Sequence, residues 1–337
     1  MHPIFGRRNG PEQLSAGIVR GETLQYRFAV REIPFTIIRG FCMGAADIVP
    51  GVSGGTIALV FGIYRRLISS IRDGSSTIGR LLKGDIKGAK ESFGDIDWLF
   101  LVPLLAGIGI AVLTLAGIIE EQLHENPEQM AGLFMGLVLG SVVVAWALLE
   151  KRDAQRIVIG LAVGVAVFVL LGLRSGTTED AVGQVSDPAL WAFFGAGALA
   201  ICAMILPGIS GSFILVMLGM YGPVLAAVSD RDLTIIAAVA LGCVVGLGVF
   251  SQVLHWALEN HYNTVMAALI GLMVGSLRVL WPWPKGVDST VIGSPDEAIV
   301  VTVALAVLGF VVVVGIDYFS RRFSKIDRDE EVAELHS

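Results

Sequence analysis

The sequence predicts an all-α polytopic membrane protein built from two inverted-topology repeats, with both termini in the cytoplasm. Three observations lead to this fold class. The 337 residues are 54% hydrophobic and only 16% charged, which is too apolar for a soluble globular protein. The 41 glycines are about 12% of the chain, against about 7% in average proteins, as is typical of closely packed transmembrane helices. The third observation is an internal repeat in which each copy contains a Pro-Gly break.

Uncharged runs long enough to cross a bilayer, about 20 residues, recur along the chain. We expect a cytoplasmic tail at 1–32, a first repeat at 33–173, a second repeat at 188–319 and a cytoplasmic tail at 320–337. Within the first repeat we expect a hairpin at 33–72, a polar loop at 73–97 and spans at 98–119, 129–149 and 157–173. Within the second we expect a hairpin at 188–229 and spans at 233–258, 262–281 and 298–319.

Each predicted hairpin is an apolar stretch interrupted by Pro-Gly, at Pro50-Gly51 and at Pro207-Gly208. The stretch 188–229 has 42 residues without a charge, which is too long for a single crossing. Because proline cannot continue a helix, each stretch is expected to form two helical arms joined at a tip. We expect these hairpins to re-enter the membrane, although two complete crossings would also fit the sequence.

The two hairpins are related in sequence. Residues 50–64 match residues 207–221 at seven of fifteen positions without a gap, and both begin with Pro-Gly-x-Ser-Gly. The match continues in the later spans, where Gly136 pairs with Gly271. A hairpin adds zero or two crossings to three spans, so each repeat crosses an odd number of times and the two must be inverted. Inverted repeats with interrupted helices are a recurring plan of transporters that bind substrate at the repeat interface.

The distribution of charge predicts the orientation. With the N-terminus inside, 20 of the 24 Lys and Arg residues fall on the inner side, as the positive-inside rule requires. The net charge of −6 leaves no large basic face, which argues against a nucleic-acid partner.

The start of each second hairpin arm is a run of Gly and Ser that opens a helix. Free N–H groups and the positive end of the helix dipole make such a start suitable for an anion, and glycine allows close approach. The alternative is a tight turn with a capping serine. The predicted phosphate-binding residues are Gly51, Ser53, Gly54, Gly55 and Thr56 in the first copy, and Gly208, Ser210, Gly211 and Ser212 in the second.

Three charges lie within or at the end of apolar segments, where insertion costs about 2.5–3.5 kcal/mol each. Arg39 either binds the phosphate or extends to the cytoplasmic surface. Asp47 either exchanges a proton and couples transport to a gradient, or is a satisfied carboxylate at a helix end. Arg278 either meets an anionic headgroup that enters from the outer leaflet, or anchors its span there.

The sequence offers little support for an enzyme. The five histidines and three cysteines show no metal-ligand spacing, and no nucleophile or phosphate-loop motif is present. We therefore expect no catalytic residue, no bound metal and no cofactor. An ion-coupled secondary transporter of a small soluble anion shares every feature described so far and remains the alternative function.

Three motifs carry a resemblance to a known family. Met43–Thr56, Leu206–Ser212, and Gly275–Arg278 with Trp281-Pro282-Trp283 resemble the bacterial polyprenyl-phosphate (undecaprenyl phosphate) transporters of the PopT type, long a membrane domain of unknown function. The resemblance covers roughly residues 33–320. It implies a flippase in the bacterial cell membrane that returns undecaprenyl phosphate from the outer to the cytoplasmic leaflet, recycling the lipid carrier for cell-wall and other envelope polymers.

Overall fold

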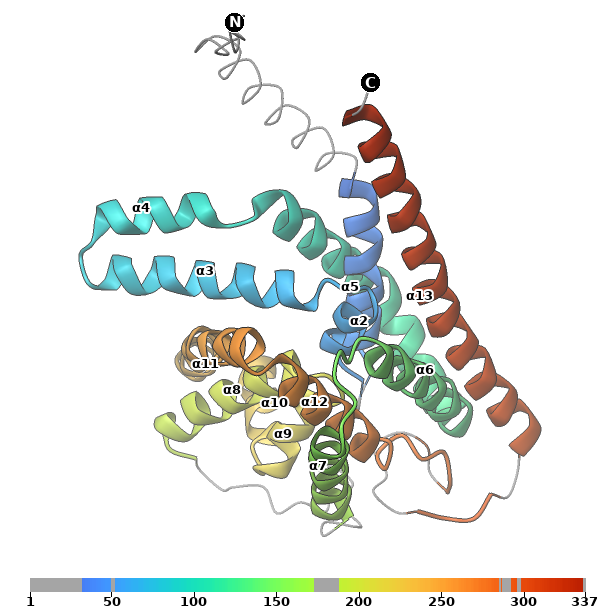
Figure 1. The fold of residues 1–337 in the computed structure, drawn as a ribbon. Coiled ribbons are helices and arrows are strands. Elements are labelled where there is room, and N and C mark those ends of the chain that lie inside the picture. Colours follow the sequence, from blue (N-terminus) through green and yellow to red (C-terminus); the bar gives the residue numbers. More distant parts are fainter. Residues whose placement is uncertain are drawn as a thin grey trace, which may run out of the picture.

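The computed structural model describes residues 32–49, 52–172, 188–284, 286, 292–295 and 298–335. Over these residues every regular element is a helix and no strand is present (Figure 1). The all-α fold class is therefore confirmed for the described part of the chain. Gly51, one of the predicted phosphate-binding residues, lies outside the described residues together with Pro50.

The first half of the chain opens with a helix over residues 32–47, called the first helix below. It continues with α2 (Gly54–Val60), α3 (Tyr64–Leu82), α4 (Ile86–Asp95), α5 (Trp98–Glu125), α6 (Pro127–Ala147) and α7 (Ala154–Gly172). The second half contains α8 (Leu190–Ile205), α9 (Gly211–Met217), α10 (Tyr221–Ser229), α11 (Leu233–Asn260), α12 (Tyr262–Ser276) and α13 (Ile299–Leu335). Helix α12 ends at Ser276, before the predicted limit of 281, and residues 277–280 continue as turns with bonds from residue i to i−3.

Five of the described helices are long and apolar enough to cross a membrane, namely α5, α6, α7, α11 and the Ile299–Phe319 part of α13. A sixth span is possible if α9 and α10 count as one, and these two helices meet at an angle of 112°. The chain is thus a polytopic membrane protein. Whether the predicted hairpins re-enter the membrane stays a prediction.

The helices of the two halves correspond in length and position. Helices α5 and α11 both have 28 residues, and their first residues are 233 − 98 = 135 positions apart. Helices α2 and α9 both have seven residues and are separated by 211 − 54 = 157 positions. Each of these short helices is followed by a glycine with positive φ, Gly62 at 69° and Gly219 at 68°. The two spacings are those at which the sequence repeats.

The last helix of each half packs against the other half. Helix α13 packs along α6, and α7 packs along the corresponding helix α12 (Figure 1). A Cβ atom on Gly136 would overlap the carbonyl oxygen of Ala306, and one on Gly271 would overlap that of Gly160. Glycine at these positions lets the helix backbones touch, as expected for membrane helix packing.

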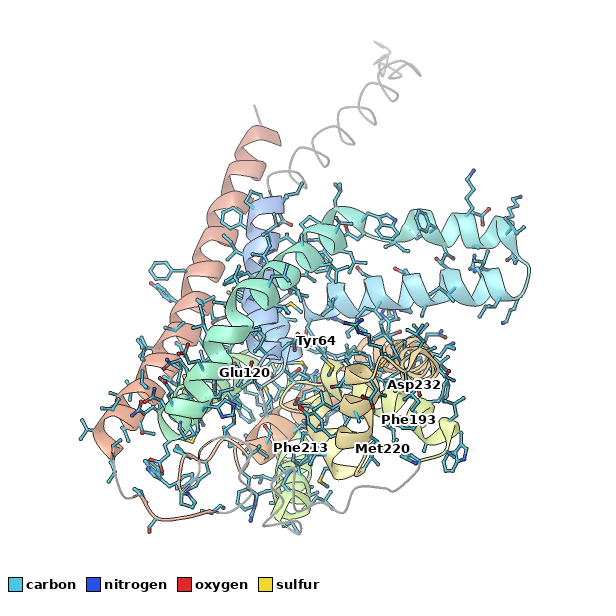
Figure 2. The ribbon with its side chains drawn as sticks, turned by 180° about the vertical axis from the view of Figure 1, so that it is seen from behind. Tyr64, Glu120, Phe193, Phe213, Met220 and Asp232 are labelled. Carbon is cyan, nitrogen blue, oxygen red and sulfur yellow. The ribbon has the colours of Figure 1, made fainter. Side chains whose placement is uncertain are left out.

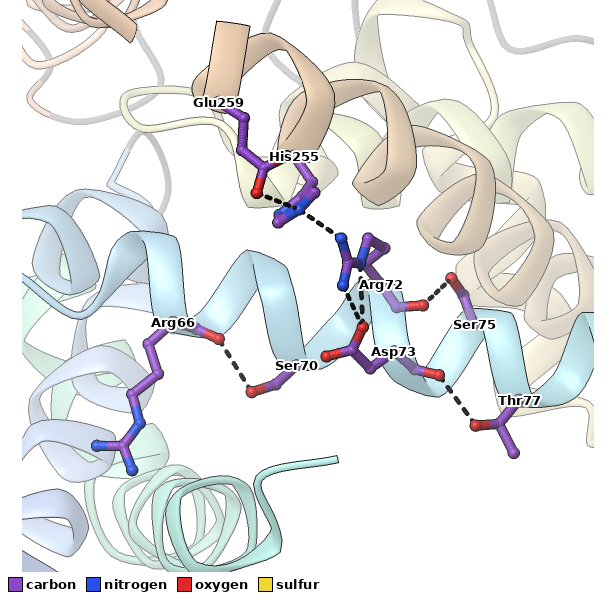
Figure 3. A network of polar contacts seen from close by, with 8 residues as sticks. All are labelled: Arg66, Ser70, Arg72, Asp73, Ser75, Thr77, His255 and Glu259. Atoms are coloured by element: carbon purple, nitrogen blue, oxygen red, sulfur yellow. Dashed lines mark hydrogen bonds and ion pairs between the residues drawn. The ribbon is translucent and has the colours of Figure 1, made fainter. Parts of the chain in front are cut away.

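The segment predicted as a polar loop, 73–97, is polar but mostly helical, because α3 extends to Leu82 and α4 follows. Hydroxyl groups along α3 bond back to carbonyl oxygens of the preceding turn, so their polar atoms are satisfied within the helix. Helix α3 packs against α11 through the network in Figure 3, in which Arg72 contacts Asp73 and His255, and His255 contacts Glu259. The composition identified this segment as polar, but tertiary packing determines that it is helical.

Candidate substrate site at the hairpin tips

The tips of the two predicted hairpins lie against each other. The Ser53 hydroxyl donates to the carbonyl oxygen of Met204 at 2.8 Å. The Gly208 amide donates to the Thr56 hydroxyl at 3.1 Å. Both first-tip side chains are buried, so these bonds are shielded from solvent. Residues about 150 positions apart in the sequence therefore form one polar cluster.

Tyr64 adds a third bond between the tips. It is buried near the centre of the molecule in Figure 2, and its hydroxyl donates to the carbonyl oxygen of Ile205 at 3.1 Å. Sequence reasoning did not select Tyr64 as a site residue. A signal was present, because Tyr64 and Tyr221 are one of the seven identities between the repeats.

The amides at the first tip already have acceptors within the chain. The Asp47 carboxylate accepts from the Gly54 amide at 2.6 Å, and the Ser53 hydroxyl accepts from the Gly55 amide at 3.1 Å. The Thr56 amide donates to the carbonyl oxygen of Ser53 at 2.9 Å. Ser53 is thus the N-cap of α2, and Asp47 is a helix-end carboxylate in this conformation.

The second tip differs from the first. At the spacing of 157 positions Met204 corresponds to Asp47, and a Cβ atom on Gly211 would lie 2.6 Å from its Cγ atom. The hydroxyls of Ser210 and Ser212 are 2.7 Å apart and bond to each other. Across the described part of the chain, the amides of Gly211 and Ser212 have no acceptor. The second tip therefore has Met204 in place of the acidic side chain, and two of its amides find no acceptor among the described residues.

Gly208 brings the second tip close to α12. Its φ of +88° is one that residues with a side chain rarely adopt. A Cβ atom there would lie 2.8 Å from the Met273 Cα atom and 2.9 Å from the Ser276 hydroxyl oxygen. The backbone of the tip is thus in direct contact with the end of α12.

Arg278 lies two residues beyond this contact, in the turn after α12. Its guanidinium carbon is 4.7 Å from the centre of the Phe168 ring on α7. A Cβ atom on Gly172 would lie 2.6 Å from the same carbon, so glycine makes room for the guanidinium group. The Nε atom of Arg278 is buried and has no hydrogen-bond partner among the described residues. A buried, unsatisfied donor on a cation is a suitable partner for an anion.

Arg39 is the predicted site residue that the structure does not connect to the tips. It is half-buried on the first helix, and no hydrogen bond or ion pair joins it to another described residue. Asp47, on the same helix, is the residue that reaches the first tip.

Comparison with known proteins identifies the family. A family model described as undecaprenyl phosphate translocase-like matches residues 43–299. The chain belongs to this family. The translocase-like family consists of transporters, so the expectation that the chain is not an enzyme is confirmed, as is the resemblance found from the motifs.

Two relatives of this translocase-like chain are named polyprenyl-phosphate transporters. The one from Vibrio cholerae serotype O1 is 38% identical over 262 residues, which cover 78% of this chain and 82% of the relative. The one from Staphylococcus aureus is 31% identical over 289 residues, covering 82% and 93%. No solved structure matches the chain. With its five or six apolar helices, this family member is a multi-pass protein of the bacterial cell membrane.

Proposed function

We propose that this protein carries polyprenyl phosphate across the cell membrane and returns undecaprenyl phosphate from the outer to the cytoplasmic leaflet. The observation that carries the proposal is the similarity to two polyprenyl-phosphate transporters over most of the chain. The polar cluster at the two tips supports it, because its amide and hydroxyl groups can donate hydrogen bonds to a phosphate inside an otherwise apolar protein. The prenyl chain stays in the bilayer while the phosphate moves through the protein.

The proposed architecture is a pair of inverted repeats with both termini in the cytoplasm. Three spans and one hairpin per repeat give an odd number of crossings, and the basic residues gather on the proposed inner side. Equal lengths of α5 and α11 support the duplication. Rocking of one repeat against the other would open the tips alternately to the two leaflets.

The phosphate is proposed to enter near Arg278 and to bind first at the second tip. Three features support this order: the amides of Gly211 and Ser212 and the Nε atom of Arg278, which have no hydrogen-bond partner among the described residues, and the hydroxyls of Ser210 and Ser212. The phosphate then contacts the first tip, through Ser53, Gly54, Gly55 and Thr56, and leaves toward Arg39.

Asp47 is proposed to couple transport to protons. As a carboxylate it occupies the Gly54 amide and repels a second anion from the first tip. When it binds a proton, the repulsion ends and the amide becomes available to the phosphate. Release of the proton on the cytoplasmic side would then expel the phosphate. Inward transport of the lipid phosphate would thus be coupled to inward transport of a proton.

The test is a flipping assay with labelled polyprenyl phosphate in vesicles that contain the purified protein, with and without a pH gradient. Charge-assisted hydrogen bonds contribute about 1.5–3 kcal/mol, so Arg278→Ala is expected to slow flipping at least about tenfold. Ser210→Ala is expected to slow flipping several-fold. Ser229→Ala, which removes an exposed hydroxyl on α10, is the matched control and is expected to flip at the parent rate.

Asp47→Asn is expected to flip at a rate that no longer responds to the pH gradient. Parent-like flipping by both Arg278→Ala and Ser210→Ala would refute the site. Uptake of inorganic phosphate or an organic acid without any lipid flipping would replace the proposal by the alternative, an ion-coupled transporter of a small soluble anion.

A further inference from the structure

Helices α3 and α4 form a hairpin that projects from the molecule (Figure 1). Both helices carry exposed apolar side chains. Leu82 is 84% exposed and Ile86 is 73% exposed, although these residue types are usually buried. The exposed apolar side chains of the two helices, together called the hairpin patch below, are Ile78, Leu81, Leu82, Ile86 and Phe93. Clusters of this kind mark surfaces that contact a partner or a membrane.

Outside its contact with α3, helix α4 has an apolar face and a charged face. At about 100° per residue, Ile86 and Phe93 fall on the same face of the helix. Lys90 lies about 40° and Lys87 about 100° around the helix from Ile86, both on the same side of the apolar face, whereas Glu91 and Asp95 lie about 140° and 180° away. An apolar face with lysines along one side is typical of helices that lie on anionic membranes.

The positive charges beside the patch are free. Lys83, Lys87 and Lys90 are exposed and form no ion pair with any residue that the structure describes. Arg80 is different, because it donates to the carbonyl oxygen of Gly88 at 2.9 Å and holds the hairpin together. The three lysines therefore remain available to an external anion.

The hairpin is joined directly to a membrane span. Helix α5, which follows α4, is one of the apolar helices long enough to cross a bilayer. At the junction the rings of Phe93 and Trp98 are 4.8 Å apart, and the Trp98 indole donates to the Phe93 carbonyl oxygen at 3.0 Å. Trp98 is partly exposed, and tryptophan is enriched where membrane proteins cross the boundary between lipid and water. The patch thus begins next to the level at which the chain enters the membrane.

We propose that the α3–α4 hairpin lies in the headgroup layer of the bilayer, where its patch contacts acyl chains and Lys83, Lys87 and Lys90 bind phosphates of anionic phospholipids. The occupant of this surface is the lipid bilayer itself. Each lysine near an anionic membrane surface strengthens binding by roughly fivefold, so the three together favour the docked hairpin by about 100-fold. This interaction is independent of the phosphate site at the tips.

The test measures the surroundings of two positions on α4 in the full chain. Ile86→Cys and Glu91→Cys are made in a background in which Cys42, Cys202 and Cys243 are replaced, and each is labelled with an environment-sensitive fluorophore. The protein is placed in nanodiscs of phosphatidylcholine, with or without phosphatidylglycerol. Acyl chains that carry a quencher are expected to quench the probe at position 86 strongly and the matched probe at position 91 weakly.

The lysines are tested in the same discs. Lys83→Gln, Lys87→Gln and Lys90→Gln combined are expected to reduce quenching at position 86 in anionic discs to the level found in neutral discs. Glu91→Gln, which changes a charge on the opposite face, is expected to leave it unchanged. Equal quenching at positions 86 and 91, or a probe at 86 that reports water in anionic discs, would overturn the proposal. A probe at 86 that becomes buried in detergent as protein concentration rises would assign the patch to a second copy of the chain instead.

Discussion

Replacement of Thr56 by valine tests whether the bond between the hairpin tips stabilises the fold. In the parent protein the Thr56 hydroxyl accepts from the Gly208 amide at 3.1 Å, and Thr56 is 1% exposed. Valine has nearly the same shape as threonine and leaves no cavity, but it cannot accept a hydrogen bond. The substitution therefore leaves the buried Gly208 amide without its acceptor.

The expected loss is the cost of an unsatisfied buried donor, about 1–3 kcal/mol in the free energy of unfolding. Water has little access to this position, because Thr56 and Gly208 are both buried. If transport separates the tips, the variant also favours the separated state by the same amount, which corresponds to about a 5- to 150-fold shift.

The chain offers a matched control in Thr302, which is also 1% exposed but whose hydroxyl has no hydrogen-bond partner among the described residues. Thr302→Val removes an unsatisfied polar atom and is expected to leave the protein as stable as the parent or more so. Both variants are unfolded by titration of dodecyl sulfate into detergent micelles, with loss of tertiary structure followed by fluorescence. Equal stabilities of Thr56→Val and Thr302→Val would refute the importance of the bond between the tips.

Two further substitutions, one in a helix contact and one in a bond between the tips, are tested in the same unfolding assay. Gly107→Ala is expected to destabilise the protein by about 1–3 kcal/mol, since its Cβ atom would overlap the carbonyl oxygen of Ile37. The control is Gly109→Ala, two residues along α5, where a Cβ atom would have nothing within 4 Å and stability is expected to stay at the parent level. A greater loss of stability in Gly109→Ala than in Gly107→Ala would contradict the backbone contact. Tyr64→Phe removes the donor to Ile205 and is expected to cost about 0.5–1.5 kcal/mol, and a fully stable variant would show that this bond contributes nothing.

The sequence was most informative where one pattern occurs twice. The Pro-Gly-x-Ser-Gly repeat located both hairpin tips, and the repeat spacing matches the observed positions of α2 and α9. Apolar runs located the long helices, although their bounds shifted by several residues. Both kinds of pattern are local, because hydrophobicity and helix termination depend on neighbours in the chain.

The sequence was less informative about the pairing of polar groups. It left two interpretations of Asp47 open, and the structure shows its carboxylate on the Gly54 amide. It assigned the phosphate to both tips, whereas the tertiary structure shows that the Asp47 carboxylate already accepts from an amide of the first tip and that Met204 packs at the second. It also did not indicate that α3 would be helical along α11, since that helix gains much of its stability from packing.

By itself, then, the sequence determined the class of the protein, the position of its long apolar helices, the two Pro-Gly tips and the family, because composition, periodicity and motifs are properties of neighbouring residues. Only the tertiary structure decided that the Thr56 hydroxyl accepts from the Gly208 amide and that the Arg278 guanidinium group packs on the Phe168 ring, with an Nε atom that finds no partner among the described residues. These contacts join residues more than 100 positions apart. Their geometry depends on how the helices of the two halves pack, which no local pattern in the chain encodes.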